Sequence, residues 1–238
     1  MNRNIFLFIF FFAIFTGSGL FGVIPGIREV LNVNVNQQDP LKENQILYNG
    51  KMWRNLYYSI KGDQFLFTKD FLQGSLTINN KSYNNINISY DIYNDEIITP
   101  TNNGSILQLN NEMVDSFTLI FAFKTYRFLN TREDSLAGVK GYVNVLYKGK
   151  SALYVKYRKE IDLLAVDDKY DLFYQTYRIY LLKDGLAHQI NGKSDLLKVL
   201  SENKTGINEF IKKNRLKISK NVPESFIPVI RYYDSIRQ

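Results

Sequence analysis

The clearest pattern of hydrophobic and polar positions in the chain lies between Asn84 and Tyr93. Apolar side chains occupy every second position: Ile86, Ile88, Tyr90 and Ile92. The positions between them carry polar side chains: Asn85, Asn87, Ser89 and Asp91. Because side chains alternate between the two faces of a strand, this pattern predicts a half-buried β-strand with one wet face.

Short strand-like runs surround this segment between residues 45 and 130. Asn79-Asn80-Lys81 separates two of the runs and favours a hairpin connection, because Asn tolerates a positive φ. A second alternating run extends from Ser116 to Phe123 and places four side chains on one face: Phe117, Leu119, Phe121 and Phe123. Runs at this spacing predict a meander of antiparallel strands.

A second β region is expected between Ser135 and Asp184. Lys148-Gly149-Lys150 is typical of a hairpin turn between a strand at 142–147 and its partner at 152–158. The run from Tyr170 to Leu182 is long and aromatic on both faces. A strand of this kind is central in its sheet, or it is covered by a helix as well as by the sheet.

The hydrophobic period changes to that of helices after Ser194, which we expect to cap a first helix. Two apolar stripes follow at helical spacing: Ile207, Phe210 and Ile211, then Phe226, Ile227, Ile230 and Tyr233. We therefore predict an α+β chain that is mainly β. Its antiparallel meander sheet, half-barrel or sandwich-like, would be covered by C-terminal helices (194–238) within a single domain at 45–238.

The first residues have the pattern of a secretory signal. Arg3 precedes an apolar run from Ile5 to Phe15, and the small residues Gly17 to Gly19 follow. This indicates a signal peptide at 1–19 and an extended leader at 20–44. The alternative is an uncleaved membrane anchor. Either interpretation predicts an exported protein, periplasmic or associated with the outer membrane.

The residue inventory excludes several kinds of chemistry. The chain has no cysteine, so it forms no disulfide, thiolate zinc site or lipidated cysteine. His188 is the only histidine, which removes histidine-clustered metal sites and most Ser-His-Asp triads. Phosphate-binding glycine loops and nucleophile elbows are also missing from the sequence. We expect no cofactor, and we predict that the protein is not an enzyme.

Two groups of carboxylates leave an alternative open. The first group is Asp91, Asp95 and Glu96; the second is Asp162, Asp167, Asp168 and Asp171. A pair of such acids across a cleft would suit a glycan-directed hydrolase, and a calcium ion at Asp167 to Asp171 is conceivable. Their position at predicted turns favours a simpler role, because Asp side chains bind backbone amides there.

The formal net charge is +7, and the predicted helical tail is its most basic segment. The basic residues of the tail are Lys198, Lys204, Lys212, Lys213, Arg215, Lys217 and Lys220. Such a tail is compatible with an anionic membrane surface as a partner, although a solvated helix face is the simpler interpretation. The sequence has no recognisable nucleic-acid-binding module, and we expect no nucleic-acid partner.

Aromatic residues supply the candidate binding surface. The chain contains 17 Tyr, 17 Phe and one Trp, and five residues are candidates for a ligand or partner surface: Trp53, Tyr57, Tyr154, Tyr174 and Tyr177. Core packing is the alternative use of these rings. The leading hypothesis is a binding or assembly module that holds an envelope protein, or an apolar or polymeric ligand, on its sheet. A structural subunit of an outer-membrane assembly is a further alternative.

Four segments carry a resemblance to a known group. They are Gly-Asp-Gln-Phe-Leu (62–66), Ser-Tyr-Asp-Ile-Tyr-Asn-Asp-Glu (89–96), Lys-Gly-Lys-Ser-Ala-Leu-Tyr-Val-Lys-Tyr (148–157) and Lys-Asp-Gly (183–185). These segments resemble uncharacterised exported β-rich proteins of Bacteroidota that have no assigned activity. The resemblance covers the chain from about Tyr48 onward. It implies an exported compartment and a β-rich architecture, and it carries over no site residue.

Overall fold

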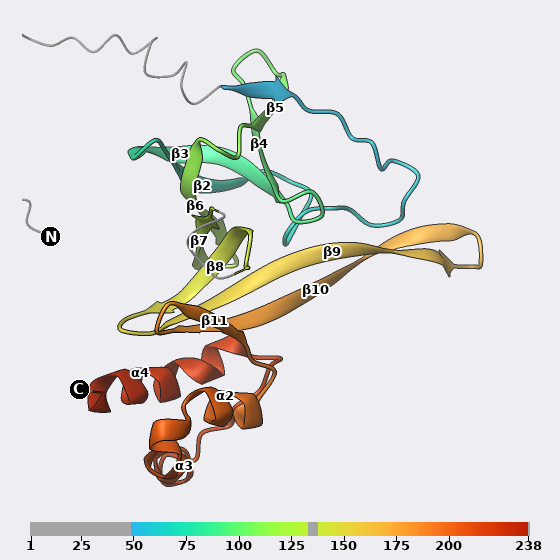
Figure 1. Ribbon diagram of the computed structural model, residues 1–238. Coiled ribbons are helices and arrows are strands. Elements are labelled where there is room, and N and C mark those ends of the chain that lie inside the picture. Colours follow the sequence, from blue (N-terminus) through green and yellow to red (C-terminus); the bar gives the residue numbers. More distant parts are fainter. Residues whose placement is uncertain (1–48, 133–137, 238) are drawn as a thin grey trace, which may run out of the picture. The chain divides into compact units, whose positions relative to one another are not determined.

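The computed structural model describes residues 49–132 and 138–237, all of which belong to one compact unit. The strands in these ranges are β1 (Gly50–Met52), β2 (Leu72–Ile78), β3 (Lys81–Asp91), β4 (Glu96–Pro100), β5 (Ile106–Leu109), β6 (Val114–Phe121), β7 (Lys124–Thr131), β8 (Gly141–Lys148), β9 (Ala152–Val166), β10 (Tyr170–Lys183) and β11 (Leu186–Gln189). The helical segments are α2 (Lys193–Val199), η1 (Ser201–Asn203), α3 (Lys204–Lys213), η2 (Pro223–Phe226) and α4 (Ile227–Ile236). Figure 1 shows their arrangement. The predicted fold class, mainly β with an antiparallel meander sheet and C-terminal helices, is confirmed.

The strands form one sheet in the order β1-β5-β4-β3-β2-β6-β7-β8-β9-β10-β11. The chain leaves β2 in one direction as far as β5, returns to the other side of β2 as β6, and then continues to β11. β1 pairs with β5 at the far side. As far as the described residues show, the sheet does not close into a barrel, and β1 and β11 form its two edges.

The alternating run predicted between Asn84 and Tyr93 forms most of β3. Ile88, Tyr90 and Ile92 are buried as predicted, and Ile86 is partly buried against the same core. Asn85 adopts a positive φ of 56°, close to a register shift between β2 and β3.

The polar face of β3 differs from the prediction at its C-terminal end. Asn85 and Asn87 are exposed, but Ser89 and Asp91 are buried. Asp91 turns inward because its carboxylate holds the turn into β4. Its Oδ1 accepts hydrogen bonds from the backbone N–H groups of Tyr93 and Asn94, both at 2.9 Å.

Two-residue turns connect several strands of the meander. Asn79 and Asn80 have φ values of 48° and 64°, which confirms the predicted hairpin and its use of Asn. The predicted run to Phe123 is wrong at its end. β6 ends at Phe121, and Ala122 and Phe123 form a turn of the same kind with φ values of 47° and 60°. Phe123 is therefore fully exposed instead of sharing the buried face.

Aromatic rings fill the core between the first eight strands. The buried residues of this ring cluster are Leu66, Leu76, Ile78, Tyr83, Ile88, Tyr90, Ile92, Ile97, Leu109, Val114, Phe117, Leu119, Phe128 and Tyr142. Phe117 stacks on Phe128 with centroids 4.6 Å apart, and it meets the rings of Tyr90 and Tyr142 edge-on at 5.1 Å each. Core packing is thus the role of these aromatic side chains.

An irregular segment crosses from β1 to β2 and contributes to this core. One of the strand-like runs, residues 64–67, forms no strand, and its Phe65 makes a single bridge to Asp91. Leu66 is buried and donates its backbone N–H to the carbonyl of Tyr90 at 2.9 Å. Lys61 exchanges backbone hydrogen bonds with β10, donating to Asp171 at 2.9 Å and accepting from Phe173 at 3.0 Å. The segment thereby ties β3 to β10.

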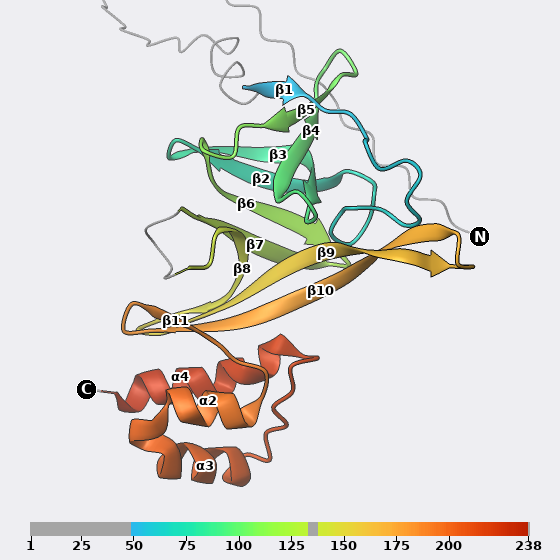
Figure 2. The same cartoon turned by 45° about the vertical axis from the view of Figure 1, so that its right-hand side comes forward.

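The helices cover β9 and β10, as Figures 1 and 2 both show. The buried residues of this helix cluster are Leu153, Val155, Ile179, Leu181, Ile190, Leu196, Leu197, Leu200, Ile207, Ile211, Phe226, Val229, Ile230 and Tyr233. Val143, Ala152 and Tyr154 form a smaller cluster with Tyr180 and Leu182. β10 is thus apolar on both faces, with helices over one of them, as its sequence predicts.

Three details of the second region differ from the predictions. Ser194 lies inside α2, whose first boundary residue is Gly192, and no side chain caps that end. His188 lies on β11 opposite Leu181, in a strand that the sequence pattern did not indicate. The predicted signal peptide and leader lie outside the described residues. In the part of the chain that the structure describes, no helix has the length and apolar character to cross a membrane.

Candidate functional site

The structure separates the five aromatic residues predicted to form one binding surface. Tyr154 is buried in the smaller cluster and offers no surface. Tyr174 and Tyr177 are partly exposed on opposite faces of β10. Tyr174 donates to Glu160 at 2.5 Å, and Tyr177 donates to the carbonyl of Lys220 at 2.9 Å. Trp53 and Tyr57 lie together near the other edge of the sheet.

Trp53 and Tyr57 belong to a short exposed segment that we call the Met52–Tyr58 surface. Five of its seven residues are large and apolar: Met52, Trp53, Leu56, Tyr57 and Tyr58. Met52, Leu56 and Tyr58 are 61%, 72% and 86% exposed, respectively. The strand-like run at 51–58 forms a strand only at its first residues, because β1 ends at Met52.

Two aromatic anchors hold this irregular segment in place. Trp53 donates its backbone N–H to Ile106 at 2.9 Å and packs on the ring of Phe65 at 6.0 Å. Tyr57 meets the rings of Tyr93 and Phe173 edge-on at 5.1 and 5.7 Å. The segment between the anchors is therefore fixed at both ends while its middle faces solvent.

A shallow depression of about 310 Å³ lies beside the anchors. Its lining combines the two rings with polar side chains: Lys51, Arg54, Asn94, Glu96 and Gln108. The hydroxyl of Tyr57 donates to Asn94 Oδ1 at 3.1 Å. Burial raises the pKa of Glu96, and the nearby charge of Asp91 raises it further. The depression thus offers ring faces next to hydrogen-bonding groups.

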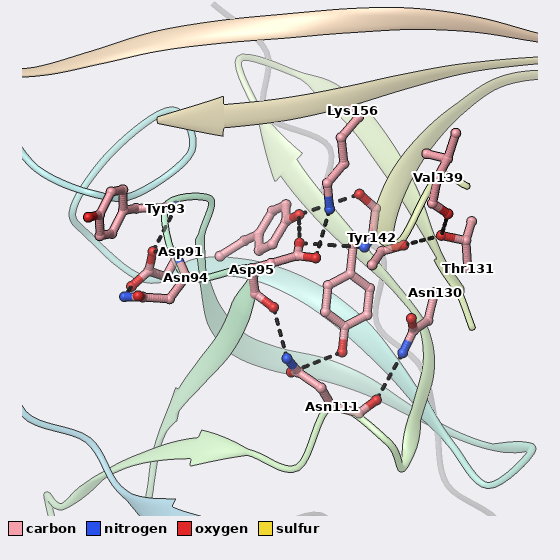
Figure 3. A network of polar contacts seen from close by, with 12 residues as sticks. Asp91, Tyr93, Asn94, Asp95, Asn111, Asn130, Thr131, Val139, Tyr142 and Lys156 are labelled. Atoms are coloured by element: carbon pink, nitrogen blue, oxygen red, sulfur yellow. Dashed lines mark hydrogen bonds and ion pairs between the residues drawn. The ribbon is translucent and has the colours of Figure 1, made fainter. Parts of the chain in front are cut away.

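A network of polar side chains lies inside the sheet, behind the turn from β3 to β4 (Figure 3). Lys156 on β9 is only 4% exposed, and its Nζ contacts Asp95 Oδ2 at 2.7 Å. Tyr90 donates its hydroxyl to Asp95 Oδ1 at 2.5 Å. Burial lowers the pKa of the Lys156 ammonium, against the opposing effect of the Asp95 carboxylate. Burial likewise raises the pKa of Tyr90, and the Asp95 carboxylate adds to that shift.

The network extends through amide side chains. Asn111 donates to the backbone carbonyl of Asp95 at 2.9 Å, and Asn130 donates to the carbonyls of Asn111 and Val114 at 2.9 Å each. Tyr142 donates its hydroxyl to Asn111 Oδ1 at 3.3 Å. These contacts satisfy polar backbone groups where the meander reverses between β5 and β6.

Neither Lys156 nor its pairing with Asp95 is among the residues predicted from the sequence. One signal was present: Lys156 is the only charged residue in the otherwise apolar run from Ala152 to Tyr157. A lysine inside such a run needs a buried partner. The identity of the partner required the fold, because Asp95 lies 61 positions away.

The other charged groups remain largely on the surface. The seven basic residues of the predicted tail are all exposed. Asp171 accepts the backbone N–H of Leu164 at 3.0 Å, which is a turn-holding role of the kind expected. Within the described ranges, no cluster of three or more His, Cys, Asp or Glu residues could hold a metal ion.

Comparison of the chain with protein-family models, with curated proteins and with solved structures finds no match.

Proposed function

We propose that this chain is a non-enzymatic binding module that holds a partner protein on its Met52–Tyr58 surface. The observation that carries the proposal is the exposure of Met52, Leu56 and Tyr58 next to the anchored rings of Trp53 and Tyr57. Grouped apolar side chains on a surface mark interaction sites, because their exposure to water is unfavourable.

The composition of the surface fits a protein partner. Trp, Tyr, Met and Arg are enriched at protein interfaces, and this segment contains Arg54 besides its apolar residues. The anchors also matter, because a segment that is already ordered loses less conformational freedom on binding. Trp53 and Tyr57 are the expected centres of binding energy, with Leu56 and Tyr58 adding contact area.

The partner that we propose is a protein of the cell envelope. This part of the proposal rests on the signal-like segment at 1–19 and on the exported group that the chain resembles. The anionic membrane surface remains an additional proposed contact for the exposed basic residues of the helical region.

Site-specific photo-crosslinking tests the proposal in cells that express the full chain. A photoreactive residue at Leu56 is expected to give one discrete protein adduct. The matched control is Leu186 on β11, which is 57% exposed but lies outside this surface. The adduct at Leu56 should disappear in a Tyr58→Asp background. Equal labelling at both positions, or labelling at Leu56 that ignores Tyr58→Asp, contradicts the proposal.

A polymeric sugar is the second candidate ligand. The observation in its favour is the depression where Asn94, Glu96 and Gln108 lie beside two aromatic rings. Trp53 is the only tryptophan of the chain, so tryptophan emission reports on this surface alone. Saturable quenching by soluble envelope oligosaccharides, lost in Gln108→Ala, would support this ligand. Unchanged emission at all concentrations would remove it.

A glycan-directed hydrolase is the alternative activity, and Glu96 would be its acid. Such enzymes use two carboxylates that flank the scissile bond. Asp91, the neighbouring carboxylate, is fully buried and accepts the hydrogen bonds of the turn. This arrangement favours binding over hydrolysis at the depression. Reducing ends released from an envelope glycan, and lost in Glu96→Gln, would reverse that preference.

A further inference from the structure

The ion pair between Lys156 and Asp95 places an amine in direct contact with a carboxyl group, the two groups that form an amide bond. Nζ of Lys156 lies 2.7 Å from Oδ2 of Asp95, in hydrogen-bond contact with the carboxyl group whose carbon it would attack. The donors to the other oxygen are the hydroxyl of Tyr90 at 2.5 Å and the backbone N–H of Tyr142 at 3.4 Å. The Lys156 amine thus contacts Oδ2 of Asp95, and two hydrogen-bond donors contact Oδ1.

We propose that Lys156 and Asp95 form an intramolecular amide bond that cross-links β9 to the turn before β4. The proposal is independent of the Met52–Tyr58 surface, since neither residue lines it. It concerns a covalent modification of the buried network that Figure 3 shows.

The surroundings of Lys156 favour the uncharged amine that the reaction needs. The side chain of Lys156 is 5% exposed, and that of Asp95 is 31% exposed. A charged amine is disfavoured in this environment, and the lowered pKa of Lys156 agrees with that expectation. Asp95 keeps enough contact with solvent for a water molecule to leave.

Gly141 lies directly beside the two groups. Its φ is +82°, and a Cβ built there would overlap Asp95 Oδ2 and lie 2.8 Å from Lys156 Nζ. No other residue type fits against the pair without displacing it. The absence of a Cβ at Gly141 thus leaves room for the amine beside the carboxyl group, and such proximity of reacting groups lowers the entropic barrier of a bimolecular step.

The reaction balances without an oxidant or a further reactant. Lys156 transfers a proton to Asp95 Oδ2, which leaves a neutral amine and a neutral carboxyl group. The Nζ lone pair attacks Cγ, and the negative charge that develops on Oδ1 is stabilised by Tyr90 and the N–H of Tyr142. A second proton moves from Nζ to Oδ2, the Cγ–Oδ2 bond breaks, and one water molecule leaves.

A neighbouring ion pair provides an internal control. Lys159 lies on the same strand and contacts Asp63 Oδ1 at 2.9 Å. Here the backbone N–H of Phe65 donates to that same oxygen at 2.8 Å, so amine and donor are not divided between the two oxygens. We expect Lys159 to remain a free amine.

Peptide mapping of the full purified chain tests the cross-link. Trypsin would release Asp95 in the peptide 82–124 and Lys156 in the peptide 151–156. The cross-link blocks cleavage after Lys156 and yields one branched species, 82–124 joined to 151–158, that lacks the mass of one water. Lys159 should stay cleavable. Separate unmodified peptides from the folded protein overturn the proposal.

Two variants sharpen the result. Lys156→Arg keeps the charge but has no primary amine, so its measured mass should equal the mass calculated from its sequence. The measured mass of the wild type should be one water below the mass calculated from its own sequence. Tyr90→Phe removes one donor to Oδ1 and should slow the loss of water when denatured chain, purified before it folds, is refolded. A Tyr90→Phe variant that cross-links at the wild-type rate contradicts the mechanism. A wild type with no water loss after refolding overturns the bond itself.

Discussion

The ring cluster and the helix cluster both cover apolar strands, but they do so with different kinds of side chain. Both bury an apolar face of one continuous sheet, and among the described residues Tyr157 packs against both. The ring cluster contains five buried aromatic residues: Tyr83, Tyr90, Phe117, Phe128 and Tyr142. The helix cluster contains two, Phe226 and Tyr233, and is otherwise aliphatic. Strands that enclose a core among themselves here use rings, whereas strands packed against helices use mainly branched aliphatic side chains.

This difference has a consequence for buried polar groups. Tyrosine rings bring hydroxyls into the core, and a buried hydroxyl needs a partner. In the first half of the sheet the partners are Asp95 and Asn111, and Asp95 in turn requires Lys156. In the second half, Asp234 accepts the hydroxyl of Tyr147 and the backbone N–H of Ser151. The ring cluster therefore contains a buried charge pair, whereas Asp234 in the second half of the sheet accepts hydrogen bonds from neutral donors.

Removing the acid beside each cluster, Asp95 or Asp234, is expected to give the largest difference between the two clusters. In a chain that has not formed the proposed cross-link, Asp95→Ala leaves Lys156 buried without its partner, and breaking such a pair costs about 3–5 kcal/mol. Asp234→Ala leaves neutral donors unsatisfied, which costs about 1–3 kcal/mol. Urea unfolding followed by circular dichroism measures both free energies. Measured against that chain, the double variant Asp95→Ala with Lys156→Met should recover most of the loss. Equal costs for Asp95→Ala and Asp234→Ala would remove the distinction.

Alkaline titration tests the burial of the tyrosines in and beside the ring cluster. Burial raises the pKa of Tyr157 from 10.0 to about 12. The folded state therefore retains a proton that the unfolded chain releases, and stability is full below pH 10 and falls as the pH rises toward 12. The two-unit difference is worth about 3 kcal/mol. Burial also raises the pKa values of Tyr90 and Tyr142, so their contributions have the same sign.

The measurement is the free energy of unfolding as a function of pH, with tyrosinate absorbance recorded in parallel. Tyr157→Phe removes one titrating group and should flatten the decline between pH 10 and 12 by about 3 kcal/mol. The buried tyrosines, whose pKa values are raised, should ionise only as the fold is lost. Complete ionisation of all tyrosines in a folded protein would show that water enters the ring cluster.

The two halves also differ in how much their sequences reveal. Alternation identified β3 and β6, and the double apolar character of β10 predicted its helical cover, because these patterns follow directly from which faces are buried. The buried ends of polar faces were not predictable. Ser89 and Asp91 lie on the expected wet face, but both are buried where β3 pairs with β4. Such burial depends on the neighbouring strand and not on the strand itself.

The candidate site shows the same limit. Trp53 and Tyr57 were predicted and lie together, whereas Tyr154 proved to be core and Tyr174 and Tyr177 point to opposite faces. Only the pairing of β9 with β10 decides which tyrosine is covered. The pair of Lys156 and Asp95 could not be predicted for a similar reason, since its partners come from β9 and from the turn before β4, 61 positions apart.

Replacing one ring in each half sharpens the packing comparison. Phe117 and Phe226 are both buried, but Phe117 makes three ring contacts within the ring cluster, while Phe226 packs in the mainly aliphatic helix cluster. Ring pairs add about 0.5–1.5 kcal/mol each beyond the area that they bury. Phe117→Leu should therefore destabilise the chain by about 1–2 kcal/mol more than Phe226→Leu. Similar losses in urea unfolding would mean that the ring geometry contributes little.

The smallest expected effect concerns the turns of the two halves. The β10–β11 turn of the helix half uses Asp184-Gly185, with φ values of 52° and 78°, a pair suited to this conformation. The β6–β7 turn of the ring half places Ala122 and Phe123 at positive φ, which is unfavourable for residues with a Cβ and no polar side chain. Ala122→Gly should stabilise the chain by about 0.5 kcal/mol, after the greater freedom of glycine in the unfolded state is subtracted.

Asn79→Gly is the matched control for that substitution, because the β2–β3 turn has the same backbone conformation but already uses Asn. Its expected effect on the free energy of unfolding is close to zero, since Asn adopts positive φ at little cost. The comparison thus isolates the strain of the Ala122 backbone from the general effect of adding a glycine. If both substitutions destabilise the chain equally, unfolded-state entropy outweighs the strain, and the β6–β7 turn is no weaker than its counterparts.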